Sequence, residues 1–334
     1  MSRSDIAAVV IGRNESARLE SCLRSLKGVR TVYVDSGSSD GSADLARTAG
    51  VELIELDAAG GFSAARGRNA GLMRATADPA IRYIQMVDGD CVVDPGWIAT
   101  GAATLDADPT LGAVFGRLRE IDPEASIYSW LCDIEWTVPP GPADMFGGLV
   151  MLRAEAVRDG GGYRSGMIAG EEPELAIRLR AAGWRILSLA QPMAEHDAGI
   201  TRFGQWWRRA VRGGHAFAEL VHLHPGRGAH DFARSRRRIL FWGGAVPCLA
   251  LTGLVAGMMF DPRWMALSAA AALLIGAQAA RATMRDRSRY GAKRAFLLAL
   301  FLAIGKYAEM IGLIRFHVDR GLKPRPRSIE REAP

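Results

Sequence analysis

The amino-terminal part of the chain alternates between short apolar runs rich in β-branched residues and stretches with apolar residues at helical spacing. This pattern predicts strands at residues 6–11, 29–34, 51–55 and 81–87, with helices at residues 15–26, 43–49 and 64–75 between them. Strands that alternate with helices form parallel sheets through right-handed crossovers. The sequence therefore predicts an α/β fold with a doubly wound, mainly parallel, Rossmann-like sheet.

The rest of the chain divides by composition. Residues 112–119, 146–153 and 184–189 are further predicted strands, and residues 171–182 are a predicted helix. Residues 202–223 combine aromatic and basic side chains in an amphipathic pattern, and from residue 239 the chain is strongly apolar. We therefore expect a globular domain at residues 1–200, amphipathic interfacial helices at 201–238, a membrane region at 239–314 and a basic cytoplasmic tail at 315–334.

The chain carries a net charge of +6, and its Lys and Arg residues cluster from Arg202 onward, beside apolar stretches. Basic runs that flank apolar segments meet anionic lipid headgroups, so we expect anionic membrane lipids as partners and no nucleic acid. The four cysteines lack the spacing of a zinc site, and residues 1–14 lack the apolar core of a signal peptide. The globular half is therefore expected in the reducing cytoplasm.

The apolar region predicts a helical hairpin followed by a third apolar stretch. Residues 239–260 are long enough to span a bilayer, and residues 264–280 form a shorter second span after a tight turn. Basic residues flank both ends of this hairpin, which predicts that both ends lie in the cytoplasm. The third stretch, residues 295–314, contains Lys306 and Glu309 and precedes a basic tail. Because a third span would place that tail outside, we expect this stretch to lie in the interface or to re-enter.

The sharpest local signal is Asp88-Gly89-Asp90, directly after the apolar run at residues 81–87. Ligands of doubly wound sheets bind at the carboxyl ends of the strands. Two carboxylates around a glycine at such an end can hold a hard divalent cation, which in turn bridges phosphate oxygens. An ordinary acidic turn has the same composition, but the position after a buried strand favours the metal site.

Two more polar loops follow other predicted strands. The loop from Asp35 to Ser42 is rich in glycine and serine, so its backbone can approach a ribose or a base closely. Helix capping by Asp40 or Ser42 is compatible with that role. Arg68 and Asn69 supply a cation and an amide near a helix start, suited to a diphosphate or a base, although a solvated basic face alone would explain them.

Glu171 and Glu172 open the predicted helix at residues 171–182. The helix dipole favours their ionised form, and one of them could take a proton from an acceptor hydroxyl. Simple acidic capping of the helix explains one of the two carboxylates and gives no reason for the whole segment 170–184.

Taken in chain order, these elements resemble the family 2 glycosyltransferases, inverting enzymes with the GT-A fold. The resemblance runs from about residue 6 to about residue 209 and rests on the following motifs: Val9-Val10-Ile11-Gly12-Arg13-Asn14-Glu15, Val34-Asp35-Ser36-Gly37-Ser38-Ser39-Asp40-Gly41, Arg68-Asn69-Ala70-Gly71, Asp88-Gly89-Asp90, and Gly170-Glu171-Glu172 with Arg178-Leu179-Arg180. Three positions depart from the family pattern: Gly12-Arg13-Asn14-Glu15 stands for the usual Pro-x-Tyr-Asn-Glu, Ser36 for the second Asp of its loop, and Glu171-Glu172 for a Glu-Asp pair.

The resemblance implies roles for individual residues. A nucleotide-sugar donor would be bound by Asn14, Glu15, Asp35, Arg68, Asn69, Asp88 and Asp90. Mn²⁺ or Mg²⁺ would be bound by Asp88, Asp90 and, as in some relatives, His196, for which a structural histidine is an equal alternative. Glu172 would be the general base, with Glu171 as the alternative because Glu replaces the usual Asp.

Residues 205–209 are similar to the Gln-x-x-Arg-Trp motif of membrane-bound members, with Arg209 in place of the final Trp. The similarity implies that Gln205 and Arg208 lie by the acceptor and the leaving diphosphate. An interfacial helix with Trp206 and Trp207 in the headgroup region is an equal alternative.

On this resemblance we expect a metal-dependent, inverting hexosyltransferase that uses a nucleotide-diphosphate sugar, favoured as a UDP-sugar. The expected acceptor is lipid-linked or a glycolipid, at the cytoplasmic face of the inner membrane, in exopolysaccharide or glycolipid biosynthesis. Two alternatives stay open: a processive polysaccharide synthase, for which two or three apolar segments are few to line a channel, and a non-catalytic membrane scaffold that kept the fold.

Overall fold

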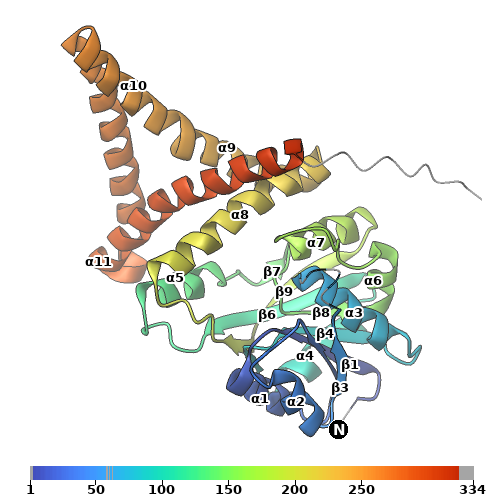
Figure 1. Cartoon of the computed structure of the whole chain (residues 1–334). Coiled ribbons are helices and arrows are strands. Elements are labelled where there is room, and N and C mark those ends of the chain that lie inside the picture. The colour runs from blue at the N-terminus through green and yellow to red at the C-terminus, as the bar shows by residue number, and fades with distance from the viewer. Residues whose placement is uncertain (1–2, 58, 60, 62, 323–334) are drawn as a thin grey trace, which may run out of the picture. The chain divides into compact units, whose positions relative to one another are not determined.

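The computed structural model describes residues 3–57, 59, 61 and 63–322 (Figure 1). The chain divides into two units, Met1–Gln205 and Trp206–Pro334, which we describe in turn.

Within the described residues of the first unit, nine strands form one sheet in the order β3-β2-β1-β4-β8-β6-β9-β5, with β7 paired to β9. The strands are β1 (Ile6–Gly12), β2 (Arg30–Asp35), β3 (Glu52–Glu55), β4 (Tyr83–Asp88), β5 (Cys91–Val93), β6 (Leu111–Glu120), β7 (Gly141–Pro142), β8 (Val150–Arg153) and β9 (Arg185–His196). The helices are α1 (Ser16–Ser25), α2 (Ser42–Thr48), α3 (Ala64–Thr76), α4 (Trp97–Ala107), α5 (Ile127–Glu135), α6 (Ala154–Gly160) and α7 (Glu171–Ala181).

The sheet is mixed and mostly parallel, which confirms the predicted fold class. Strands β3, β2, β1 and β4 run parallel to one another, and β6 runs parallel to β9. Strand β8 is antiparallel to both β4 and β6, and β5 and β7 are antiparallel to β9. Helices cover the sheet, and the strand residues 7–10 in its middle are fully buried. This packing explains the continuous apolar runs seen in the sequence, because strands covered on both faces have no solvent side.

The register of the parallel strands places the polar loops at one edge. Gly12 at the end of β1 lies opposite Asp35 at the end of β2, and Ile11 lies opposite Asp88 at the end of β4. The loops that follow these three strands therefore meet at the carboxyl edge of the sheet, where ligands of doubly wound folds bind.

Two strands differ in length from the prediction. Strand β8 begins at Val150, because the chain before it stays irregular at Gly148, where a Cβ atom would lie 2.5 Å from Asp88 Oδ2. Strand β9 does not end at residue 189 but continues to His196, since it pairs along its second half with β5 and with the end of β6. The extension carries His196 to the same edge of the sheet as Asp90.

The second unit is helical. It contains α8 (Phe203–Leu223, whose first residues belong to the first unit), the short 3₁₀ helix η2 (Arg227–Ala229), α9 (His230–Ile239), the π-helical segment η3 (Leu240–Ala245), α10 (Val246–Met259), the 3₁₀ helix η4 (Pro262–Trp264) and α11 (Met265–Leu322). Gly291, with φ 77° and ψ 159°, interrupts α11. The second predicted span and the third apolar stretch lie on either side of this break. The predicted basic tail begins inside α11, and from residue 323 onward it lies outside the described residues.

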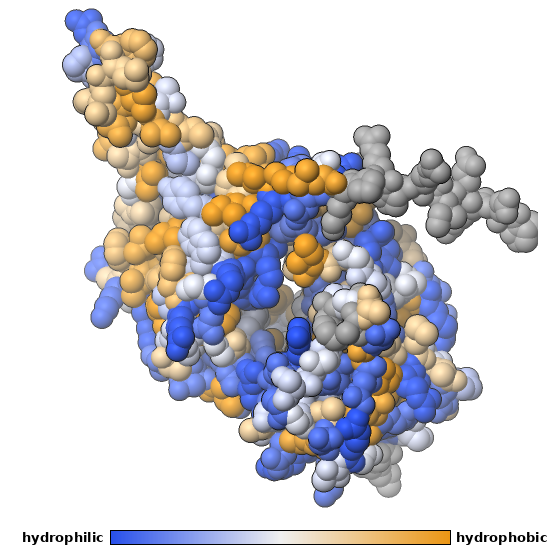
Figure 2. Space-filling model, in the orientation of Figure 1, coloured by the Kyte–Doolittle hydropathy of each residue, from blue (hydrophilic) through white to orange (hydrophobic). Residues whose placement is uncertain are grey.

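Helix α10 and the first part of α11 form a hairpin. Ser268 Oγ donates a hydrogen bond to the carbonyl oxygen of Ala250 at 2.6 Å, and a Cβ on Gly253 would lie 2.7 Å from the Ser268 nitrogen. Figure 2 shows apolar residues gathered over this hairpin. Among the described residues, two helical stretches, His230–Met259 and Pro262–Leu322, are long and apolar enough to cross a membrane by length and composition. Most residues of their most apolar parts are not buried inside the protein.

The second part of α11 packs against α8. Trp206 meets Phe301 edge to face with ring centroids 5.1 Å apart, and His215 meets Phe316 in the same way at 5.3 Å. Glycines let the two helices approach closely, since a Cβ on Gly214 would collide with the carbonyl group of Glu309. The third apolar stretch, residues 295–314, is thus helical, and one side of this helix packs against α8.

Candidate active site

The loops after β1 and β2 are joined by hydrogen bonds. Asn14 lies in the left-handed region with φ 59°. Its side-chain oxygen accepts a hydrogen bond from the Ser39 backbone amide at 2.8 Å, and its backbone amide donates to Ser38 Oγ at 2.9 Å. Ser42 Oγ accepts from the Glu15 amide at 3.1 Å. These bonds fix the shape of the edge where the sequence predicted a nucleotide site.

Asp35 is buried at the end of β2, with 2% of its surface exposed. Its carboxylate accepts hydrogen bonds from the Tyr33 hydroxyl at 3.1 Å and from the amides of Gly37 and Ser38 at 2.9 and 2.8 Å. In this structure Asp35 therefore organises the glycine- and serine-rich loop, and its predicted contact with a nucleotide stays a prediction.

The centre of the site is Arg68, which is 3% exposed and faces three carboxylates. Its guanidinium lies 2.8 Å from Asp88 Oδ1, 2.6 Å from Glu171 Oε1 and 3.0 Å from Glu172 Oε1. The Tyr163 ring lies 5.7 Å below the guanidinium carbon. The structure thus brings together four residues that the sequence predicted from three separate motifs.

The charges around Arg68 do not balance. When all three carboxylates are ionised, they carry three negative charges against one positive charge, in surroundings with little water. Burial raises the pKa of Glu172 to about 7, against the opposing effect of Arg68. Glu172 can therefore exchange a proton near neutral pH, as a general base must.

Asn69, next to Arg68, holds a loop in place. Its side-chain amide nitrogen donates to the Tyr163 carbonyl at 2.6 Å and to Ser165 Oγ at 2.9 Å, and its oxygen accepts from the Tyr163 amide at 2.8 Å. This clamp ties helix α3 to the loop that leads into Glu171. The predicted donor contact of Asn69 stays a prediction.

Asp90 pairs with His196 on the other side of the strand edge, with Oδ2 and Nε2 3.1 Å apart. Burial alone lowers the pKa of His196, but the hydrogen bond and charge of Asp90 outweigh burial, so the pKa is raised. Burial by itself raises the pKa of Asp90, but the hydrogen bond and charge of His196 outweigh burial, so the pKa of Asp90 is lowered. Two of the three predicted metal ligands are therefore in direct contact, and both favour their charged forms, whereas the third, Asp88, faces Arg68.

Glu15 completes the acidic edge. Its side chain lies between Gly12 and Gly89, and its carboxylate is 2.7 Å from Arg18. Burial, followed by the charge of Asp90, raises its pKa. Arg18 also donates to the carbonyl oxygen of Asp197 at 3.2 Å, which links the first turn of α1 to the residue that follows β9.

Gln205 caps the start of α8. Its oxygen accepts from the amides of Thr201 and Arg202 at 3.0 and 2.9 Å, and its nitrogen donates to the Gly199 carbonyl at 3.0 Å. Arg208 is exposed on α8 in the second unit. The predicted contacts of both residues with acceptor and diphosphate stay predictions.

Several residues of the site were not predicted from the sequence. Cys91 places its sulfur 3.6 Å from Asp90 Oδ1, Trp136 packs its ring 4.5 Å from the His196 ring, and Tyr163 is buried beside Arg68. The buried strand end before Cys91 was a usable signal for that residue. Trp136 and Tyr163 reach the site through tertiary packing and carried no local signal.

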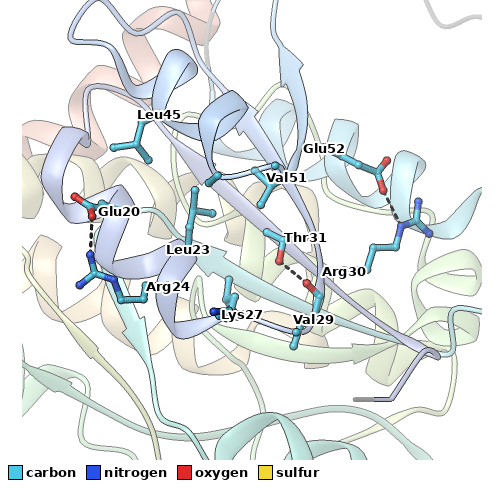
Figure 3. Close-up of a pocket in the computed structure, with 14 residues that line it drawn as sticks. Glu20, Leu23, Arg24, Lys27, Val29, Arg30, Thr31, Leu45, Val51 and Glu52 are labelled. Atoms are coloured by element: carbon cyan, nitrogen blue, oxygen red, sulfur yellow. Dashed lines mark hydrogen bonds and ion pairs between the residues drawn. The ribbon is translucent and has the colours of Figure 1, made fainter. Parts of the chain in front are cut away.

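A surface pocket of about 500 Å³ lies at the opposite ends of the strands (Figure 3). It is formed where α1 ends, β2 begins and α2 ends, with Leu23, Val29 and Leu45 along its walls. Four of its five charged side chains pair with one another, Arg24 with Glu20 at 2.5 Å and Arg30 with Glu52 at 2.7 Å, and the fifth is Lys27. The carboxylates around Arg68 are not among its lining residues, so we do not assign it to the site.

Comparison with known proteins agrees with this geometry. Residues 8–139, which include the loops after β1, β2 and β4, match the family described as Glycosyl transferase family 2. The chain contains a family 2 glycosyltransferase domain. This match confirms the predicted family resemblance.

The glycosyltransferase domain has relatives among curated proteins and solved structures. The pre-mycofactocin glycosyltransferase of Mycobacterium tuberculosis is 26% identical over 77% of this chain and 54% of its own length, so the chain spans about half of that relative. The mannosyltransferase PcManGT from Pyrobaculum calidifontis, solved with GDP-Man and Mn²⁺, is 16% identical with a TM-score of 0.57 over 95% of this chain and 88% of its own. S. aureus TarS 1–349 in complex with UDP is 14% identical with a TM-score of 0.50 over 96% and 93%. The two structures support the GT-A fold.

Proposed function

We propose that this chain transfers a hexose from a nucleotide-diphosphate sugar, most simply a UDP-sugar, to a hydroxyl group of a lipid-linked or amphiphilic acceptor. The observation that carries the proposal is the cluster of Asp88, Glu171 and Glu172 around the buried Arg68, at the ligand-binding edge of a glycosyltransferase sheet. Relatives that carry GDP-Man or UDP in their solved structures support a nucleotide-sugar donor.

In the proposed reaction Glu172 is the general base. It takes the proton of the acceptor hydroxyl while that oxygen attacks the anomeric carbon, and the bond from that carbon to the diphosphate oxygen breaks with inversion. The raised pKa of Glu172, about 7, suits proton transfer near neutral pH. Glu171 has the shorter contact with Arg68 and a more buried side chain, 6% exposed against 16%, so we assign it to holding Arg68.

The site also fits a divalent cation, held by Asp88, Asp90 and His196. The carboxylates around Arg68 outnumber the positive charges, and His196 Nδ1 is a buried nitrogen without a hydrogen-bond partner in the described part of the chain. When bound, Mn²⁺ or Mg²⁺ would neutralise charge on the leaving diphosphate. Carboxylate oxygens at a strand end are ligands that both ions accept.

We further propose that the hairpin of α10 and the first part of α11 inserts into the inner membrane, with the glycosyltransferase domain in the cytoplasm. Large apolar side chains on the hairpin are exposed, which an aqueous surface does not favour. They include Leu251, Met258, Met259, Phe260, Leu273 and Met284. The second part of α11 would lie along the interface with α8, since it packs on an amphipathic helix and carries the ion pair of Lys306 and Glu309 at 2.5 Å. Basic residues beside these helices would meet anionic lipids.

The activity is tested with purified full-length protein, a panel of nucleotide sugars and Mn²⁺, by measuring nucleoside diphosphate release with and without lipid extracts. We expect Glu172→Gln to lower the rate by about 10²–10⁴-fold, the usual contribution of a positioned base. Asp90→Ala should also lower the rate, through loss of a ligand to the activating ion. Glu195→Gln, an exposed neighbour of His196, is the matched control and should keep the rate. Unchanged turnover in both site variants would show that these residues are not the catalytic ones.

The membrane arrangement is tested by labelling. In a Cys248→Ser background, which removes the exposed cysteine, a Ser328→Cys substitution should react with a membrane-impermeant thiol reagent only after the cells are opened. Labelling of intact cells at that position would place the tail outside and contradict the interfacial assignment of residues 295–314.

A further inference from the structure

Three chemically different side chains converge at the end of β4: the Asp90 carboxylate, the Cys91 thiol and the His196 imidazole. One ligand atom from each lies within 4.8 Å of the other two. The convergence follows from strand pairing, because β5 and β9 are antiparallel and their register places Cys91 directly opposite His196. Asp90 immediately precedes Cys91, so the backbone fixes all three positions.

The separations match those of a tetrahedral zinc site. Zinc binds sulfur at about 2.3 Å and nitrogen or oxygen at about 2.0 Å, so tetrahedral angles place a sulfur and an oxygen ligand about 3.5 Å apart, and an oxygen and a nitrogen ligand about 3.3 Å apart. Here Cys91 Sγ lies 3.6 Å from Asp90 Oδ1, and Asp90 Oδ2 lies 3.1 Å from His196 Nε2. A small rotation of the carboxylate brings the three ligands around one point.

Protein shields two members of this group from solvent. His196 Nε2 faces Asp90 Oδ2 at 3.1 Å, so a cation bound by both takes the place of the proton between them, while Nδ1 has no hydrogen-bond partner among the described residues. The ring of Trp136 covers the imidazole at 4.5 Å, and Cys91 is fully buried. A metal in this position would have protein on the sulfur side and the acidic edge on the other, where a water molecule can complete the tetrahedron.

We propose that Asp90, Cys91 and His196 form a site for a borderline-soft divalent cation, of which zinc is the natural example, and that this site shares Asp90 with the proposed Mn²⁺ or Mg²⁺ site. Binding replaces the S–H bond of Cys91 with an S–Zn bond and the Nε2–H bond of His196 with an N–Zn bond, and both protons are released to the buffer. Thiolate selects zinc and cobalt over manganese and magnesium, which prefer oxygen ligands. Zinc is therefore an inhibitor that competes with the activating ion. This last consequence rests on the proposed function, whereas the binding does not.

The test uses Co²⁺ as a spectroscopic stand-in for zinc on metal-free, full-length protein. A Co²⁺–thiolate bond gives a charge-transfer band in the near ultraviolet that oxygen and nitrogen ligands do not give. We expect the band in the wild type and in Cys22→Ser, and its loss in Cys91→Ser. Cys22 is the matched control because it is also buried at this edge, with its sulfur 3.8 Å from the Asp88 carbonyl oxygen, yet lies outside the three-residue group. Zinc affinity, measured by competition with Co²⁺, should fall at least about tenfold in Cys91→Ser.

The outcomes separate this proposal from the proposed function. Absence of the band in the wild type overturns the site without reference to any variant, and so does a band that persists in a folded Cys91→Ser protein. Thermal unfolding without metal checks the folding of each variant. In turnover assays with Mn²⁺, added zinc should inhibit the wild type and Cys22→Ser more strongly than Cys91→Ser, each relative to its own zinc-free rate. A protein that shows the band but no turnover with any nucleotide sugar keeps the zinc site and loses the proposed function.

Discussion

Replacement of Arg68 by Met tests the idea that one buried cation holds the site together. The substitution keeps much of the side-chain volume but removes the positive charge that lies 2.6–3.0 Å from Asp88, Glu171 and Glu172. Two unit charges about 4 Å apart attract by about 4 kcal/mol at an effective dielectric constant near 20, and desolvation of the charges offsets part of that gain. Loss of one member of a buried pair costs about 3–5 kcal/mol in comparable cases, because the remaining charge is left uncompensated. We expect the free energy of unfolding to fall by that amount at pH 8.

The loss should depend on pH in a defined direction. The pKa of Glu172 in the folded protein, about 7, is raised from an ordinary value of 4.5, so the protonated form is favoured by folding. Its contribution to stability is fully present below about pH 4.5 and is lost as the pH rises through about 7. Without Arg68 the folded-state pKa rises further. The Arg68→Met protein should therefore recover part of its stability at pH 6, and the acid limb of its rate profile should move to higher pH.

The assay combines urea unfolding at pH 6 and pH 8 with pH profiles of donor turnover. Arg74→Met is the control, because Arg74 lies on the same helix but pairs with Glu52 at the surface, and exposed pairs contribute about 0–1 kcal/mol. If Arg68→Met unfolds like Arg74→Met at both pH values and keeps the wild-type acid limb, Arg68 does not organise the carboxylates and the argument is wrong.

Three further predictions concern the same edge. Gly148→Ala should lose about 1–3 kcal/mol of stability and most donor turnover, since its Cβ would lie 2.5 Å from Asp88 Oδ2 and 2.7 Å from Arg68 Nη2. Gly147→Ala is the control, because its Cβ would meet nothing within 4 Å, and it should behave as wild type in the same unfolding and turnover assays. Gln205→Ala should cost about 1 kcal/mol in urea unfolding through loss of the α8 cap while acceptor KM stays within about twofold; unchanged stability with a raised acceptor KM would refute the capping role. His196→Asn should flatten the stability profile of the metal-free protein between pH 6 and pH 8, because the raised pKa of His196 contributes stability that is present below about 6.5 and lost as pH rises through the folded-state pKa. A profile as steep as that of the wild type would contradict the last prediction.

The sequence was most informative where chemistry and periodicity coincide. The strands that end at Gly12, Asp35 and Asp88 were predicted to within about two residues, because their apolar runs are continuous and each stops at a polar loop. The convergence of those loops followed from parallel pairing alone. The nearness of Glu171 and Glu172 to Asp88 was implied by family resemblance, and the structure adds Arg68 as the group that joins them.

What the sequence could not predict depends on long-range contacts. The hydrogen bonds of Asn69 to Tyr163 join residues 94 positions apart, and no local sequence pattern around Tyr163 predicts this contact. The extension of β9 to His196 arises from pairing with β5, a strand of only three residues. The late start of β8, at Val150, accompanies the close approach of Gly148 to Asp88 and Arg68, which no local pattern encodes.

The break in α11 at Gly291 limits how deep the chain can be immersed. A residue with φ 77° and ψ 159° leaves the helical ladder, so backbone amide and carbonyl groups around it need another partner. Hydrocarbon offers none, and each unpaired group there costs several kcal/mol. If the hairpin is inserted as proposed, Gly291 must sit in water or among headgroups. The position of Gly291 then limits the depth of insertion, because the hairpin residues that lie in hydrocarbon must all precede it.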